Sequence, residues 1–330
     1  MAQTRPVTIP SSEYLEVGPR RSRRARVRNL ALIAGRNKLG AIGLVLVVIV
    51  LFTALFSPFL QRYDDARVFQ TANPNFNPTA SPIEIAANPG IGSPTILDRW
   101  ERPFTSKHWF GTDQYGRDIY ARIIVGARLA VIIGIGASAI AVLIGTAVGL
   151  ISAYFGGKID LVTQRFVDSI QAFPGLVLLM LIVSVRDQPS LTLTVLALGF
   201  LGFASSVRIV RSSVLSVSQS MYVEAARSYG AGHARLMLRH ILPNILAAVV
   251  VIFSISIGLY ILAEASLSFL GLGPADQTTW GKMVNSGRFA IDLHPWESLF
   301  SGAAITLAVL GFNLAGDALR DEMDPRLRGR

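Results

Sequence analysis

Six long apolar runs, separated by polar segments, form the main pattern of this 330-residue chain. A helix of about 20 apolar residues, rising about 1.5 Å per residue, spans a hydrocarbon layer roughly 30 Å thick. The runs cover residues 39–59, 130–155, 167–185, 191–207, 245–263 and 299–315. They predict an all-α integral membrane protein with six transmembrane helices.

Residues within two of the runs predict local packing. Gly145 and Gly149 form a small-xxx-small pair, which permits another helix to approach closely. The third run begins near Asp168 and contains Pro174, so we expect a kink near its first turn. Arg165 and Asp168 fall on one helix face, and we expect a structural ion pair there rather than a proton relay.

The polar segments divide the remaining chain into tails and loops. Residues 1–38 hold nine Arg and Lys and are interpreted as a basic tail. Residues 60–128 contain closely spaced prolines, which disfavour regular helix or strand, and are interpreted as a long loop. The membrane core is then 129–316, interrupted by a polar loop at 208–244, and 317–330 is a C-terminal tail.

The end of the long loop predicts a short helix before the second run. Thr112 or Asp113 is expected to cap this helix, because their side-chain oxygens can accept hydrogen bonds from free N–H groups. Gly116, Arg117 and Asp118 would form its polar first turn. A structural anchor and a substrate contact are both open for this turn.

Charge decides the orientation of the chain in the membrane. An even number of spans places both termini on one side, and Arg and Lys are enriched on the cytoplasmic side. The tail at 1–38 is strongly basic, whereas the loop at 264–298 has only Lys282 and Arg288. We therefore expect cytoplasmic N and C termini, with 60–128 outside and 208–244 in the cytoplasm.

The cytoplasmic loop at 208–244 has helix signals of its own. Ser220 can cap a helix, Glu224 stands near its positive end, and Gly230 suits a left-handed stop. A second helical stretch leads to Pro243, which can open the next membrane helix. The pattern predicts an elbow of two short helices along the membrane surface. A docking element and a plain connector are equally compatible with it.

Composition excludes several other classes. The chain is 51% hydrophobic and only 16% charged, so its net charge of +10 indicates a membrane protein rather than one that binds nucleic acid. It has no cysteine, and its four histidines lack the spacing of a metal site. No phosphate-binding Gly-x-x-x-x-Gly-Lys-Ser/Thr motif is present, so we expect neither catalytic residues nor a cofactor in this chain.

The segment EAARSYGAGHARLMLRHILPN, residues 224–244, resembles the Glu-Ala-Ala loop of ABC-importer permeases. In that family this loop docks on a cytoplasmic ATPase subunit and transmits its movement. The resemblance implies a coupling role for Glu224, Ala225, Ala226, Gly230, His240, Leu242 and Pro243. Many permeases have Ile where this chain has His240, and the histidine points to the peptide-importer branch.

Three further segments resemble the C-type permease of oligopeptide and dipeptide importers. They are HWFGTDQYGRDIYARIIVGAR at 108–128, EASLSFLGLG at 264–273 and GDALRDEMDPRLRGR at 316–330. The first supplies an outer-face signature, Gly111, Thr112, Asp113, Gly116, Arg117 and Asp118. The chain departs from relatives at 276–279 and Ser301, where prolines are common, which affects the outer loops rather than the family.

The resemblance implies a type I ABC-importer permease fold in a bacterial or archaeal cytoplasmic membrane. The implied partners are a second permease, one or two ATPase subunits that hold ATP and Mg, and an extracytoplasmic binding protein. Peptides are the implied cargo, although relatives carry nickel, glutathione, opines, haem or oligosaccharides. Ser254, Ser256 and Tyr260 are candidates for lining the pathway. A stand-alone channel, an ion-driven carrier and a membrane scaffold are the alternatives.

Overall fold

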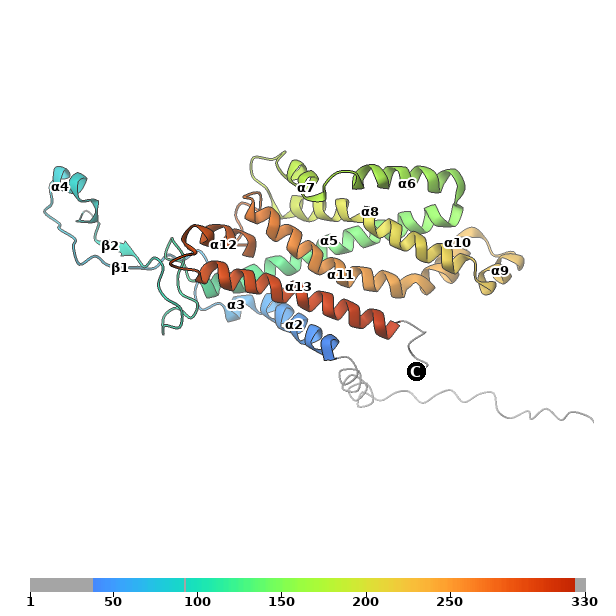
Figure 1. Ribbon diagram of the computed structural model, residues 1–330, viewed down its shortest axis with the longest axis horizontal. Coiled ribbons are helices and arrows are strands. Elements are labelled where there is room, and N and C mark those ends of the chain that lie inside the picture. The colour runs from blue at the N-terminus through green and yellow to red at the C-terminus, as the bar shows by residue number, and fades with distance from the viewer. Residues whose placement is uncertain (1–37, 92, 324–330) are drawn as a thin grey trace, which may run out of the picture.

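The computed structural model describes residues 38–91 and 93–323. Its long helices run along one axis and form an elongated bundle (Figure 1). They are α2 (Lys38–Leu55), α5 (Ile119–Phe155), α8 (Leu191–Ser218), α11 (Leu242–Phe269) and α13 (Trp296–Met323). Each is long and apolar enough to cross a membrane, α11 together with the turns that precede it. Apart from Lys38, the predicted basic tail lies outside the described residues.

Glycines bring α5 and α8 together in the most extensive helix contact of the bundle. A methyl group on Gly149 of α5 would stand 2.9 Å from the carbonyl oxygen of Val207, and Gly145 faces Ser206. This close approach confirms the small-xxx-small packing expected from the sequence. Fully buried aliphatic side chains such as Ile133 and Ile261 fill the space between α5, α8 and α11.

The kink expected in the third span, 167–185, is present as a break at Pro174, and the helical segment begins earlier than predicted. The chain forms two helices there, α6 (Gly157–Gln171) and α7 (Gly175–Val183), which meet at 81°. Pro174 lies in the break because it has no N–H group with which to continue the hydrogen bonding of α6. In the described chain, α6 and α7 qualify as a sixth crossing only when they are counted together as one broken span.

Ion pairs to α8 explain why α6 begins well before the apolar run. The carboxylate of Asp160 accepts two hydrogen bonds from the Arg211 guanidinium, at 2.7 and 2.6 Å. Asp168 lies 2.5 Å from Arg208 and 3.9 Å from Arg165, so the predicted Arg165–Asp168 pair is present but is the weaker of the two. These pairs hold the polar face of α6 on α8.

Other helices also extend beyond their apolar runs. α5 begins at Ile119 rather than at 130, and α8 continues to Ser218 rather than ending at 207. The first third of the predicted loop at 208–244 is therefore the end of α8, and the predicted tail at 317–330 begins inside α13. Hydropathy marks the part of a helix that suits lipid, whereas backbone hydrogen bonding continues the helix into polar sequence.

The segment between α2 and α5 contains the regular structure that its prolines had argued against. Its elements are α3 (Ser57–Leu60), β1 (Gln70–Ala72), α4 (Pro82–Ala87), η1 (Pro89–Ile91) and β2 (Thr95–Leu97). β1 and β2 pair antiparallel, with Gln70 opposite Leu97. Pro82 fits the first turn of α4, where Ser81 and Glu84 form a capping box. We call residues 61–97 the arm; it projects from one end of the bundle (Figure 1).

The two ends of the bundle carry different structures. The arm lies at one end, next to α12 (Trp280–Gly287) and η3 (Arg288–Ala290), while α9 (Met221–Ser228) and α10 (His233–Arg235) lie at the other (Figure 1). The start of α2 and the end of α13 both lie on the side of α9 (Figure 1). This arrangement agrees with the predicted even number of crossings.

Candidate functional site

The segment between α8 and α11 forms an elbow, residues 219–241, at the end of the bundle opposite the arm (Figure 1). Gly230 ends α9 with φ of +82°, the left-handed conformation that the sequence suggested. Its N–H donates to the carbonyl of Arg227 at 3.0 Å, which closes the last turn. Ser220 occupies the predicted N-cap position, but its hydroxyl donates to the carbonyl of Val217 at 2.6 Å instead of capping α9.

The elbow has one short helix rather than the two predicted. After Gly232 the chain is helical without interruption through α10, η2 (Leu236–Ile241) and α11. η2 has π-type hydrogen bonding, and it ends just before Pro243, which cannot donate a backbone N–H. The side-chain amide of Asn244 donates to the carbonyl of His240 at 2.6 Å. The second half of the elbow is thus a rigid extension of a membrane helix.

The elbow has a buried face and an exposed face. Val223, Leu236 and Ile241 are buried in a cluster with side chains of α5, α8 and α11. Met221 and Tyr229 are 87% and 93% exposed. Among the predicted coupling residues, those left exposed are Glu224, Ala225, Gly230 and Pro243, and those half-buried are Ala226, His240 and Leu242. An anchored short helix with exposed small and apolar side chains suits a groove on another protein.

A contact that the sequence did not predict braces the elbow. The hydroxyl of Tyr154, near the end of α5, lies 2.8 Å from Nδ1 of His233 in α10. The two residues are 79 positions apart, and hydropathy along the chain does not indicate that they meet. The brace connects the elbow to α5 as well as to α8 and α11.

At the opposite end of the bundle, the chain makes tight turns before α5. Gly111 has φ of +81° and lies against the carbonyl oxygen of Glu101, while Gly116 has φ of +74°. A methyl group on Gly116 would stand 2.8 Å from the carbonyl oxygen of Phe69. Both the conformation and the lack of space therefore require glycine at these two predicted positions.

The predicted helix cap at Thr112 or Asp113 is wrong, and the described residues 112–118 form no separate helix before α5. The N-cap of α5 is Asp118, whose carboxylate accepts a hydrogen bond from the N–H of Ala121 at 2.8 Å. Nδ1 of the buried His108 lies 2.7 Å from the same carboxylate. Thr112 instead accepts a hydrogen bond from the N–H of Glu101 at 2.9 Å. The turns at 111–118 keep the chain out of a helix until Asp118.

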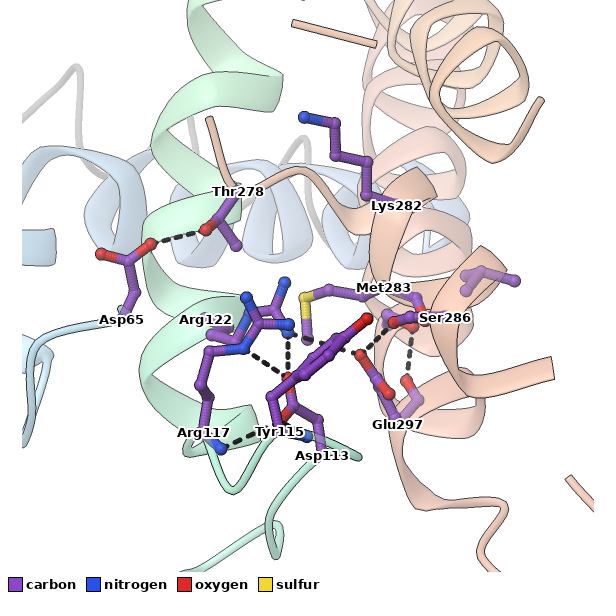
Figure 2. Close-up of polar contacts among 12 residues, drawn as sticks. Asp65, Asp113, Tyr115, Arg117, Arg122, Thr278, Lys282, Met283, Ser286 and Glu297 are labelled. Carbon is purple, nitrogen blue, oxygen red and sulfur yellow. Dashed lines mark hydrogen bonds and ion pairs between the residues drawn. The ribbon is translucent and has the colours of Figure 1, made fainter. Parts of the chain in front are cut away.

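A buried cluster of charges lies beside these turns (Figure 2). Asp113 accepts hydrogen bonds from Arg117 Nε, at 2.8 Å, and from the guanidinium of Arg122. Arg122 also lies 3.5 Å from Glu297 of α13, whose carboxylate accepts a hydrogen bond from the Ser286 hydroxyl of α12 at 2.5 Å. The sequence predicted Asp113 and Arg117 but missed Arg122 and Glu297, because they lie in two predicted loops that are far apart in the sequence.

Comparison with known proteins connects this architecture to a family. Residues 145–329, more than half of the chain, match the family described as binding-protein-dependent transport system inner membrane component. The chain belongs to this family. Residues 35–82 of this transport component also match the N-terminal TM domain of oligopeptide transport permease C. It is therefore a multi-pass membrane protein that works as part of a transport system.

The transport component also resembles curated proteins over most of its length. It is 35% identical to the oligopeptide permease OppC of Bacillus subtilis over 88% of this chain and 87% of the relative. It is 35% identical to the dipeptide permease DppC of Alkalihalophilus pseudofirmus over 97% and 94%. It is 34% identical to the glutathione permease GsiD of Escherichia coli O1:K1 over 93% and 90%.

In this transport component, α12 is held firmly among the helices at the arm end. The indole N–H of Trp280 donates to the carbonyl of Ile123 at 3.0 Å, and Gly126 leaves room for the indole ring. Lys282 Nζ donates to backbone carbonyls that include Ala275 and Gln277, at 3.0 and 3.1 Å. Burial lowers the pKa of the Lys282 ammonium, which the nearby carboxylates partly oppose.

The pathway candidates lie on α11. Tyr260 is buried with its ring against Gly202 of α8, Ser256 is buried, and Ser254 is half-buried. Helix packing accounts for the burial of Tyr260 and Ser256. A role in lining a pathway stays a prediction for all three.

Proposed function

We propose that this chain is one of two similar permease subunits of an ATP-driven importer for peptides. The observation that carries the proposal is the elbow. It is anchored by a buried apolar face, braced by Tyr154, and continuous with α11, so a force applied to α9 would move a membrane helix. Its other face is exposed and free to dock on a partner.

The partner expected at the elbow is a cytoplasmic ATPase. The chain has no phosphate-binding loop, so ATP and Mg would be held by one or two partner subunits. In this proposal the elbow and both termini face the cytoplasm of a bacterial or archaeal cell, and the arm end faces outward, where an extracytoplasmic binding protein delivers cargo. ATP-driven closure of the ATPases would push α9 and rock the two permeases between inward and outward openings.

Peptides are the cargo that the comparisons favour. The relatives described above are named as oligopeptide, dipeptide and glutathione permeases, and glutathione is itself a small peptide. None of these names supports nickel, an opine, haem or an oligosaccharide. Uptake of labelled peptides by the assembled importer, with glutathione and nickel as competitors, tests this choice.

Cross-linking tests the proposed docking directly. The chain has no cysteine, so an Ala225→Cys variant carries a single thiol on the exposed face of α9. We expect a thiol–amine cross-linker to join it to an ATPase subunit in membranes that contain the whole complex. Ile83→Cys, on the arm and 81% exposed, is the matched control and should give no such product.

Two results would count against the proposal. One is an adduct with the ATPase from Ile83→Cys but none from Ala225→Cys. The other is substrate flux through vesicles that contain this chain alone, which would favour a stand-alone channel or an ion-driven carrier.

A further inference from the structure

We infer that Arg122 is a positioning residue that, through Asp113 and Glu297, locks the arm-side ends of α5, α12 and α13 into one rigid block. We call residues 98–123 and 278–298 the outer block. Within the proposed function, this block is the part of the permease that moves as a unit when the importer alternates. No described side chain of α6, α7 or α8 contributes an ion pair to it.

Geometry is the first argument. Four separate parts of the chain meet at the cluster: the turns at 111–118, the first turns of α5, α12 and the start of α13 (Figure 2). Arg122 lies between the carboxylates of Asp113 and Glu297 and within ion-pair distance of both. The planar guanidinium offers several donors in fixed directions, so one side chain can hold two acceptors in a defined arrangement.

Burial is the second argument. Asp113 and Glu297 are fully buried, and Arg122 is 5% exposed. Removing charges from water is costly, and well-packed apolar side chains often stabilise a fold as well as a buried ion pair does. What the ionic contact adds is a specific arrangement, because a shifted helix would leave a buried charge without its partner. In the described chain, Arg122 Nε and Glu297 Oε2 lack a hydrogen-bond partner, so the buried charges depend on the two ion pairs for most of their compensation.

Independent contacts join the same parts. The rings of Trp100, before the turns, and His294, before α13, stack with centroids 5.2 Å apart. The hydroxyl of Thr278 donates to Asp65 at 2.5 Å (Figure 2), and Trp280 donates to the carbonyl of Ile123. The Trp100–His294 and Trp280–Ile123 contacts join the two segments of the outer block, and the Thr278–Asp65 contact joins the second segment to the arm. Together these contacts indicate that the outer block is one rigid body rather than several hinged segments.

A covalent tie within the block tests the inference. Trp100→Cys with His294→Cys places two thiols at the stacked pair in a chain that otherwise has none, and neither residue belongs to the charge cluster. We expect a short bifunctional thiol reagent to cross-link the pair without changing ATP-driven peptide uptake by the complex. Each single-cysteine variant treated with the reagent is the control. Loss of uptake on cross-linking alone would overturn the inference, since the block would then have to open.

The same cross-link between positions 100 and 294 tests the role of Arg122, because it can restore uptake that an Arg122 variant has lost. We expect Arg122→Met to lower uptake per ATP hydrolysed roughly tenfold, because it leaves two buried carboxylates poorly paired. If Arg122 acts by positioning, the cross-link should restore most of this loss. Normal uptake by Arg122→Met, or a loss that the cross-link does not restore, would overturn the inference. If Arg122→Met fails to assemble, Glu297→Gln, which can still accept from Ser286, takes its place in the same test.

Proteolysis can be measured without transport, so it tests this inference independently of the proposed function on which the inference rests. Arg99 and Lys107 lie in the block, so trypsin should cleave there faster in Arg122→Met than in the wild type, and the cross-link should suppress the difference. Absence of ATP-driven uptake by the wild-type complex would refute the proposed function alone. Unchanged trypsin cleavage in the variant would refute the rigid block alone.

Discussion

Gly230 is the residue at which sequence and structure agree most directly. Its φ of +82° is a conformation that L side chains rarely adopt, and a Cβ built there would contact nothing within 4 Å. The requirement for glycine is therefore one of backbone conformation rather than of space. Such a requirement is local, which is why the sequence alone predicted it.

Replacing Gly230 tests the elbow at the residue scale. We expect Gly230→Val to reduce ATP-driven uptake roughly tenfold, because strain of about 1–3 kcal/mol would shift the end of α9 and weaken docking on the ATPase. Insertion into the membrane should be unaffected. Transport and ATP hydrolysis are measured together on the reconstituted complex.

Gly232 supplies the matched control. It lies in the same elbow, is also exposed, has φ of −67° and leaves open space for a side chain. Gly232→Val should therefore transport nearly normally. Equal losses in both variants would show that side-chain bulk, not backbone conformation, disturbs the elbow.

Asp118 illustrates a residue whose role the sequence misplaced. We expect Asp118→Ala to destabilise the chain by about 1–2 kcal/mol, because α5 loses its N-cap and the buried His108 loses its partner. The melting temperature of the purified chain in detergent measures this. Asp187→Ala, at an exposed position between α7 and α8, should leave it unchanged. An equal shift in both variants would mean that the cap contributes nothing specific.

Among the elements, α6 is attached to the bundle by ion pairs that the sequence did not predict. It is polar on one face, and that face is held by Arg208 and Arg211 of α8. Hydropathy cannot detect it, because the ion pairs that stabilise it join residues far apart in sequence. For the same reason the sequence placed Asp168 at the start of a span, although it lies in the last turn of α6.

Removing one of these ion pairs tests the attachment of α6. We expect Arg211→Gln to raise amide hydrogen exchange in α6 roughly fivefold, because the two hydrogen bonds to Asp160 are lost. Mass spectrometry of exchanged peptides from 157–171 measures the change. Arg165→Gln removes a 3.9 Å pair at a highly exposed side chain and should have no effect. A similar increase in both variants would contradict the assignment.

For the whole molecule, thiol labelling tests the orientation in the membrane. A single cysteine at Ile83 of the arm or at Tyr229 of the elbow is well exposed, and the two lie at opposite ends of the bundle (Figure 1). A membrane-impermeant thiol reagent should label Ile83→Cys in intact cells and Tyr229→Cys only after the membrane is opened. The reverse pattern would contradict the orientation that the charge bias predicts.

The sequence by itself determined the class of protein, the approximate membrane helices and the stop at Gly230. These features follow from local physics, since apolar runs partition into lipid and a left-handed residue favours glycine. Tertiary structure alone decided the ion pairs that hold α6 on α8, the brace between Tyr154 and His233, and the meeting of Arg122 with Glu297. Each of these depends on which distant side chains become neighbours once the helices pack, and hydropathy along the chain carries no record of that.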